Sequence, residues 1–178
     1  MARLFIATSA VLLAALTPAF AQSLPEKTGV NSAMGIAPKT QDFVAAAAQS
    51  DMLEIASSKL ALARSDSEKS KQFAEQMIKD HTETSTELKG LVAGGKTKVD
   101  LPAALDKTHQ DKLDRLSKLA GKEFTKEYDD MQVAAHKDAV SLFERYSKGG
   151  DNADLKAFAG KTLPHLQHHL MMAQDLSK

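Results

Sequence analysis

The amino-acid sequence predicts an all-helical domain, a bundle of four long helices arranged as two hairpins, and three observations lead to this prediction. From Thr40 onward helix-forming residues dominate, and the apolar residues recur every three or four positions. No alternating run of apolar and polar residues is long enough for a strand. The chain has no cysteine, so packing rather than cross-linking must stabilise it.

The first residues have the pattern of a cleaved export signal. Arg3 is followed by an apolar run, residues 4–16, and Ala19-Phe20-Ala21 is a small-residue cleavage motif before Gln22. The run is too short to remain as a membrane span. We therefore expect residues 1–21 to be removed as a signal peptide, the protein to reach the periplasm, and no integral membrane segment to remain.

Residues 22–39 contain Pro25, Gly29, Gly35 and Pro38 without an apolar period, which predicts a flexible leader before a bundle domain at residues 40–178. Loss of Arg3 leaves 22 basic residues against 23 acidic ones. This balance argues against a nucleic-acid surface and against a polybasic membrane patch.

The first predicted hairpin consists of two long helices. One covers residues 40–64, and the next starts after Ser65, because Ser65-x-x-Glu68 has the spacing of a capping box. The second helix ends at Gly94-Gly95, a helix-stop signal. A turn this short places the two helices antiparallel.

The second predicted hairpin follows a long connection. Asp100-Leu101-Pro102 should open a shorter helix that closes at Gly121. A long helix is expected over residues 123–148, and Asp151 should cap the last helix. Pro164 lies inside that last helix, four residues after Gly160, and predicts a kink there.

The connection, residues 94–122, is long enough to run from one end of the bundle to the other. A helix of about 18 residues covers roughly 27 Å of the roughly 35 Å that the long helices span. This length permits a ferritin-like arrangement with one crossover. An up-down-up-down bundle with the short helix folded outside is an open alternative.

Polar residues on apolar helix faces are the candidates for function. Helical projection places His81 and His169 within the apolar arcs of their helices, His136 at the flank of its arc, and His165 one turn before His169. Glu54 belongs to a helix that is apolar nearly all round, so projection does not decide where it points. Buried imidazoles need partners for both ring nitrogens.

Two interpretations account for these residues. The first is a metal site in the bundle interior, formed by Glu54, His81, His136 and His169, one from each long helix, with His165 as a fifth ligand or as a partner of a ligand. Histidine and carboxylate together suit zinc, iron, copper or nickel. The second is a buried hydrogen-bond network of the same groups without metal.

Other chemistry finds little support. His109 and His168 are expected in solvent, and the methionines at helical spacing are typical of core filling rather than of a cuprous site. No phosphate-binding loop, no Gly-x-Ser-x-Gly and no His-Glu-x-x-His occurs. The missing cysteine excludes thiolate catalysis, iron–sulfur ligation and a lipoprotein anchor. The motifs therefore assign no reaction.

Several stretches together resemble DUF4142, an exported bacterial family of unknown function. They are Phe43-Val44-x-x-Ala47 to Asp51-Met52-x-Glu54, Phe73-Ala74-x-x-Met77-x-x-Asp80-His81, the set Tyr128, Gln132 and His136, and Leu163-Pro164-x-Leu166-x-x-His169-Leu170. The resemblance covers about residues 40–177. It implies a ferritin-like bundle in the periplasm or outer envelope, in a family often labelled a putative membrane or outer-membrane protein, and it implies no activity.

The sequence departs from the diiron proteins among ferritin-like bundles. Those proteins carry Glu-x-x-His on two helices. Here Ile78, Val133 and Leu166 stand three residues before the three candidate histidines. A carboxylate-bridged diiron centre is therefore not expected.

Two classes of function follow from these features. One is a periplasmic metal-binding or metal-dependent protein that uses the interior Glu/His set. The other is a non-catalytic envelope or stress-related module that binds an envelope protein or the membrane surface, which an exposed apolar groove would favour.

Overall fold

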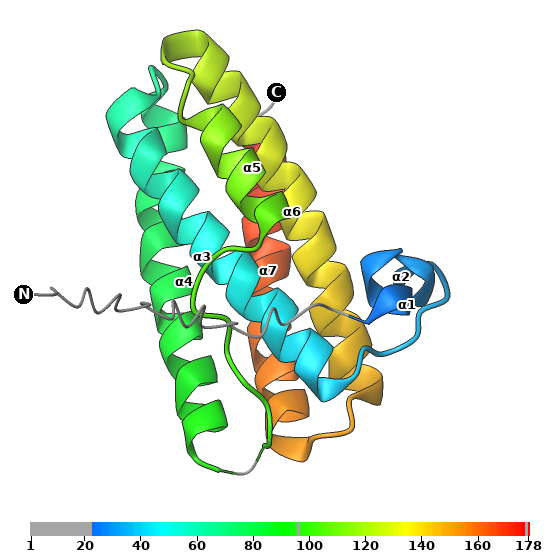
Figure 1. The fold of residues 1–178 in the computed structure, drawn as a ribbon. Coiled ribbons are helices and arrows are strands. Elements are labelled where there is room, and N and C mark those ends of the chain that lie inside the picture. Colours follow the sequence, from blue (N-terminus) through cyan, green and yellow to red (C-terminus); the bar gives the residue numbers. More distant parts are fainter. Residues whose placement is uncertain (1–22, 96, 177) are drawn as a thin grey trace, which may run out of the picture.

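The computed structural model describes residues 23–95, 97–176 and 178, and over these residues the fold is entirely helical, as predicted. Four long helices lie side by side (Figure 1). They are α3 (Thr40–Arg64), α4 (Glu68–Ala93), α6 (Gly121–Gly149) and α7 (Ala153–Leu176). The shorter helices are α1 (Leu24–Lys27), α2 (Val30–Ala33) and α5 (Lys107–Leu116). The predicted cleavage site before Gln22 lies outside the described residues.

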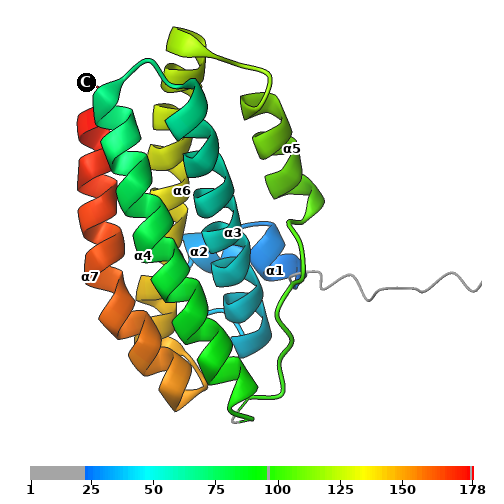
Figure 2. The ribbon, with the colours of Figure 1, turned by 90° about the vertical axis from the view of Figure 1, so that its left-hand side faces the viewer.

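The path of the chain joins two helical hairpins through one long connection. α3 and α4 form one antiparallel hairpin, and α6 and α7 form the other. The connection between them runs back along the bundle, with α5 in its second half (Figure 2). α6 therefore starts at the same end as α4 and runs in the same direction, while α5 covers α3 and α6 from outside.

α5 starts later than the Asp100-Leu101-Pro102 motif predicted. Residues 100–106 are not helical, and Asp106 caps α5 by accepting a hydrogen bond from the backbone N–H of His109. Two glutamines of α3 hold the preceding segment through its backbone groups. Gln41 binds both backbone groups of Asp100, at 3.0 and 3.2 Å, and Gln49 binds the carbonyl of Ala104 and the N–H of Asp106, at 2.9 and 2.8 Å. These bonds replace the ones that an additional helical turn would have made.

Two other predicted caps are displaced along the chain. α4 is capped by Ser67, whose hydroxyl accepts from the N–H of Ser70 at 3.2 Å, and not by Ser65. At the start of α7, Asn152 accepts from the N–H of Leu155 at 3.0 Å. Asp151, the predicted cap, binds Thr40 and Tyr146 instead. α7 continues through Pro164 without a break.

Residues 23–39, which the sequence predicts as a flexible leader, contact the bundle. Ser23 donates from its backbone N–H and its hydroxyl to the buried carboxylate of Asp42, at 2.8 and 2.6 Å. Glu26 pairs with Arg145 of α6 at 2.7 Å, and Arg145 also donates to the carbonyl of Ile36 at 2.7 Å. These hydrogen bonds and this ion pair involve single residues, so a search for apolar periodicity does not detect them.

The apolar core is divided into two clusters along the bundle. One cluster contains residues 43–48 of α3, with partners between Leu88 and Val92, Ala139 and Tyr146, and Leu155 and Leu166. The other contains residues 60 and 61 of α3 with partners nearer the opposite ends of the same helices, such as Met77, Val133 and Met172. On every long helix a short interval separates the two clusters. Glu54, His81, His136 and His169 lie in these intervals, and His165 does not.

Candidate metal centre

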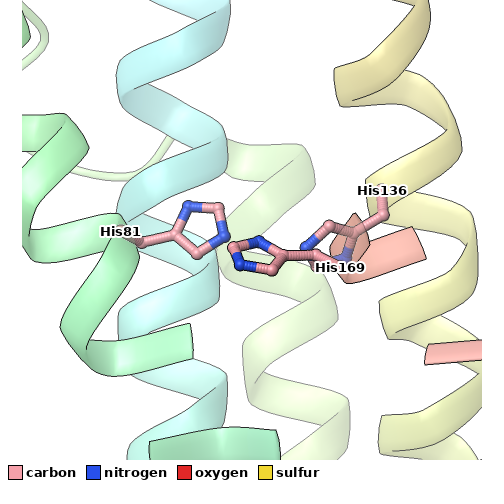
Figure 3. Close-up of side chains that lie close together, drawn as sticks. All are labelled: His81, His136 and His169. Atoms are coloured by element: carbon pink, nitrogen blue, oxygen red, sulfur yellow. The ribbon is translucent and has the colours of Figure 1, made fainter. Parts of the chain in front are cut away.

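Three histidines from three different helices meet in the interval between the two apolar clusters. His81 comes from α4, His136 from α6 and His169 from α7 (Figure 3). One ring nitrogen of each lies within 4.8 Å of the other two, and the ring centroids are 5.5–5.7 Å apart. All three side chains are buried. The sequence-based prediction that these residues share the bundle interior is thus matched by their positions.

One nitrogen of each ring is bonded to an acceptor away from the cluster. Nδ1 of His81 lies 2.8 Å from Oδ1 of Asp51, and Nε2 of His169 lies 2.9 Å from Oδ2 of Asp80. Nδ1 of His136 lies 2.9 Å from the backbone carbonyl oxygen of Gln132. Because carboxylate and carbonyl oxygens only accept, each of these nitrogens carries the proton.

The other nitrogen of each ring has no partner. Nε2 of His81, Nε2 of His136 and Nδ1 of His169 are buried without a hydrogen bond. In a neutral ring whose first nitrogen is protonated, the second holds a lone pair and no proton. A histidine ligand in a metalloprotein has this same arrangement, in which a protein acceptor orients the ring and the free lone pair binds the metal.

Glu54 adds a carboxylate to the same layer. Its side chain is 1% exposed, and neither oxygen has a hydrogen-bond partner. Its charge acts on both His81 and His136. Helical projection left the orientation of Glu54 open, and the structure shows that its side chain points into the core. Its oxygens do not belong to the group of histidine nitrogens that lie within 4.8 Å of one another.

The protonation of the cluster follows from burial and from the acidic neighbours. Burial and the charge of His81 lower the pKa of His169 to about 4, and burial also lowers the pKa of His136. Burial alone would lower the pKa of His81 as well, but the hydrogen bond and charge of Asp51 outweigh it and raise this pKa. At neutral pH His136 and His169 are consequently neutral, as metal ligands must be.

The arrangement leaves the hydrogen-bond network interpretation incomplete. A buried network is stable when every donor and acceptor is paired. Here the outer half of the network is paired and the inner half, three nitrogens and a carboxylate, is not. A cation bound by the three inner nitrogens would pair with them, and the carboxylate of Glu54 would supply opposite charge in the same layer.

The sequence was compared with protein families, with curated proteins and with solved structures. A family model described as a domain of unknown function, DUF4142, matches residues 25–176. The chain belongs to the DUF4142 family. No curated protein and no solved structure matches it significantly. Family membership confirms the resemblance inferred from the sequence motifs and brings no activity with it.

In this DUF4142 chain the remaining histidines lie apart from the centre. His165 is exposed on α7, one turn before His169, and is not part of the cluster. His168 is exposed as well, as expected. His109 lies on α5, where its ring contacts the capping residue Asp106 at 2.8 Å.

The sequence reasoning missed the acceptors of the ring protons, Asp51 and Asp80. Both lie within the motifs that carry the DUF4142 resemblance, Asp51 three residues before Glu54 and Asp80 next to His81. Asp51 stands one turn before Glu54 on a helix that had already been predicted. A search for a second acidic residue beside each interior candidate would have found them.

None of the described helices of this DUF4142 protein combines the length and the apolar character needed to cross a bilayer.

Proposed function

We propose that this DUF4142 protein is a periplasmic metal-binding protein whose ion is held by His81, His136 and His169 with Glu54 as the carboxylate ligand. The observation that carries the proposal is the set of three buried, unpartnered ring nitrogens aimed at one another. Each belongs to a ring whose other nitrogen is already bonded to an acceptor. His165 has no part in the proposed centre.

The donor set and the buried charge favour a divalent transition metal. Three imidazoles and one carboxylate offer nitrogen and oxygen ligands, which suit zinc, iron, copper and nickel in the divalent state. Cuprous ion prefers sulfur ligands, and none belongs to this set. Two buried carboxylates, Glu54 and Asp51, face the cluster, and a charge of +2 would balance them.

Metal analysis of the untagged protein, purified from the periplasm, tests the proposal. We expect close to one metal ion per chain, lost in His81→Ala and in His169→Ala. Added metal should raise the melting temperature of the metal-free protein, because binding to the native state alone stabilises it, by about 2.7 kcal/mol at a hundredfold excess over Kd. His168→Ala, an exposed neighbour on α7, is the matched control and should retain the metal.

Loss of stability alone does not distinguish a ligand from a network member. His81→Ala removes the bond to the buried Asp51 and should cost about 1–3 kcal/mol even without metal, and His169→Ala removes the bond to the partly exposed Asp80. The proposal fails if the wild type is metal-free, shows no thermal shift with zinc, copper, iron, nickel or manganese, and unfolds identically in chelator.

We further infer that the fold is ferritin-like and that the protein is exported. One long crossover between two hairpins is the connectivity of ferritin-like bundles, and the connection that carries α5 has this course. Export is supported by the charged start, the apolar run of residues 4–16 and the Ala19-Phe20-Ala21 motif.

A second candidate function is a non-catalytic envelope module. The observation in its favour is a set of exposed apolar side chains on residues 24–36: Leu24, Val30, Met34 and Ile36. Clustered exposed apolar residues mark interaction surfaces. Cosedimentation with phosphatidylethanolamine and phosphatidylglycerol vesicles tests this function. Binding by the wild type that Leu24→Ser with Met34→Ser abolishes would support it, and no binding by the wild type would contradict it.

A further inference from the structure

The polar layer contains more unpartnered atoms than the proposed metal accounts for. Six buried side-chain atoms of the described residues in this layer have no hydrogen-bond partner. They are the three inner ring nitrogens, both carboxylate oxygens of Glu54, and Oε1 of Gln132. Buried polar groups are normally paired, so each of the six indicates a partner that is neither a side chain nor the backbone.

Gln132 is bonded to His136 of the cluster and, through Ser57, to the backbone of Glu54. It is fully buried on α6, one turn before His136, and its backbone carbonyl accepts the ring proton of that histidine. Its side-chain nitrogen donates to the hydroxyl of Ser57 at 3.4 Å. Ser57 stands one turn after Glu54 on α3 and donates its own proton to the carbonyl of Glu54 at 3.2 Å.

These bonds orient the amide of Gln132. Because the hydroxyl proton of Ser57 is used by the backbone of Glu54, Ser57 can only accept from the amide, and the amide therefore presents its nitrogen to Ser57. The amide oxygen then points elsewhere and remains unpaired. It is an acceptor in need of a donor.

A metal with four protein ligands pairs only four of the six atoms. Three nitrogens and one oxygen of Glu54 bind the ion, which leaves the second oxygen of Glu54 and Oε1 of Gln132. Both atoms accept hydrogen bonds and neither can donate one. A water molecule bound to the metal through its oxygen has two O–H groups free to donate, which is the number required.

We propose that the metal centre keeps one exchangeable coordination position, which holds a water molecule donating to Glu54 and to Gln132, and which small anions such as azide can enter. The inference rests on the proposed metal site. It assigns Gln132 as a positioning residue and makes the centre open rather than closed. Structural metal sites are closed by four protein ligands, whereas reactive sites keep a position for water or substrate.

Electron paramagnetic resonance of the full-length exported protein loaded with copper(II) tests this inference. We expect pulsed spectra of the wild type transferred into D₂O to show the deuterons of a copper-bound water, which couple more strongly than the ring N–D groups of the histidines, and azide to remove that signal. Gln132→Leu should bind the same amount of copper while its deuteron signal falls by half or more. Gln49→Leu, a buried glutamine that binds the connection instead, should match the wild type in both measurements.

The outcomes separate this inference from the metal site itself. Wild type that binds copper without the deuterons of a copper-bound water shows a closed site, which overturns the inference and leaves the metal site intact. A full deuteron signal in Gln132→Leu overturns the role of Gln132. Wild type that binds no metal overturns both proposals. Should Gln132→Leu not fold, Ser57→Ala releases the amide and must weaken the deuteron signal, or the role of Gln132 is again overturned.

Discussion

At the scale of single residues, the histidine cluster combines opposite electrostatic effects within a few ångströms. The hydrogen bond and charge of Asp51 raise the pKa of His81, while burial and the charge of the neighbouring His81 lower the pKa of His169. The pKa values of these two rings are therefore shifted in opposite directions. Acidification should therefore lower the stability of the metal-free protein through His169.

The metal-free protein should lose stability between pH 6.5 and pH 4 because of His169. Its pKa is about 4 in the native state and about 6.5 in the unfolded chain, so only the unfolded chain takes up a proton in this window. Stability then falls with falling pH, by up to about 3 kcal/mol from this group. Urea unfolding at a series of pH values, in chelator, measures the effect.

Comparison with His169→Gln isolates this residue from the groups that face it, His81, His136 and Asp80. Since the raised pKa of His81 acts with the opposite sign, only the difference between wild type and variant is interpretable. An equal pH slope in the two proteins would refute the prediction.

Replacing glycine by alanine should have opposite effects on stability at two positions. A Cβ on Gly150 would lie 2.6 Å from both Cε1 and the carbonyl oxygen of Tyr146, whose ring stacks on Phe43. Gly150→Ala should therefore destabilise the protein by about 1–3 kcal/mol. Gly90 lies inside α4 with open space around its Cα, so Gly90→Ala should stabilise by about 0.5–1 kcal/mol. Thermal unfolding measures both, and equal signs would contradict the packing argument.

At the scale of elements, polar clasps hold the segments outside the four long helices, in addition to apolar contacts such as those of Leu101 and Leu116 with the core. Gln41 and Gln49 hold the connection before α5, and Asp42 and Arg145 hold the residues around α1 and α2. Each clasp uses a side chain of the bundle to bind the backbone or an opposite charge of the segment. Such contacts specify where a segment lies without requiring a regular pattern in its sequence.

The Glu26–Arg145 pair should matter more than an exposed ion pair. Both side chains are less than a tenth exposed, and Glu26→Gln leaves the Arg145 charge buried with a weaker partner. We expect a loss of about 1–3 kcal/mol in thermal or denaturant unfolding. Lys148→Ala removes an exposed pair with Glu144 on the same helix and should cost under about 1 kcal/mol. Equal effects of the two variants would show that the segment does not dock in solution.

At the scale of the whole molecule, the polar layer of Glu54 and the three histidines divides a long bundle into two apolar halves. The four long helices each contribute one group to the polar layer, so a bound ion would link helices that are distant in the chain. Metal binding should then stabilise the bundle as a unit and should not affect one hairpin alone.

The exported protein should begin at Gln22. Cleavage after Ala21 leaves one residue before Ser23, whose backbone N–H bonds Asp42. Intact mass spectrometry of the periplasmic fraction measures this directly. A mass that retains residues 1–21 would mean that the apolar run serves as an anchor, and a start after Ser23 would be incompatible with the Asp42 contact.

The sequence by itself determined the helical class, the four long helices and the family, because apolar residues at helical spacing and the short motifs around them are local signals. It also selected Glu54, His81, His136 and His169, since a polar group on an apolar face is visible in one helix at a time. Only the tertiary structure decided that His165 stays at the surface, that Glu54 points inward, and that the connection crosses the bundle.

The acceptors Asp51 and Asp80, the amide of Gln132 and the docking of residues 23–39 were also decided only in three dimensions. The physical reason is the range of the interactions. Helix formation follows from neighbours within one or two turns. Which nitrogen of a histidine is left unpaired depends on side chains that the fold brings together from other helices.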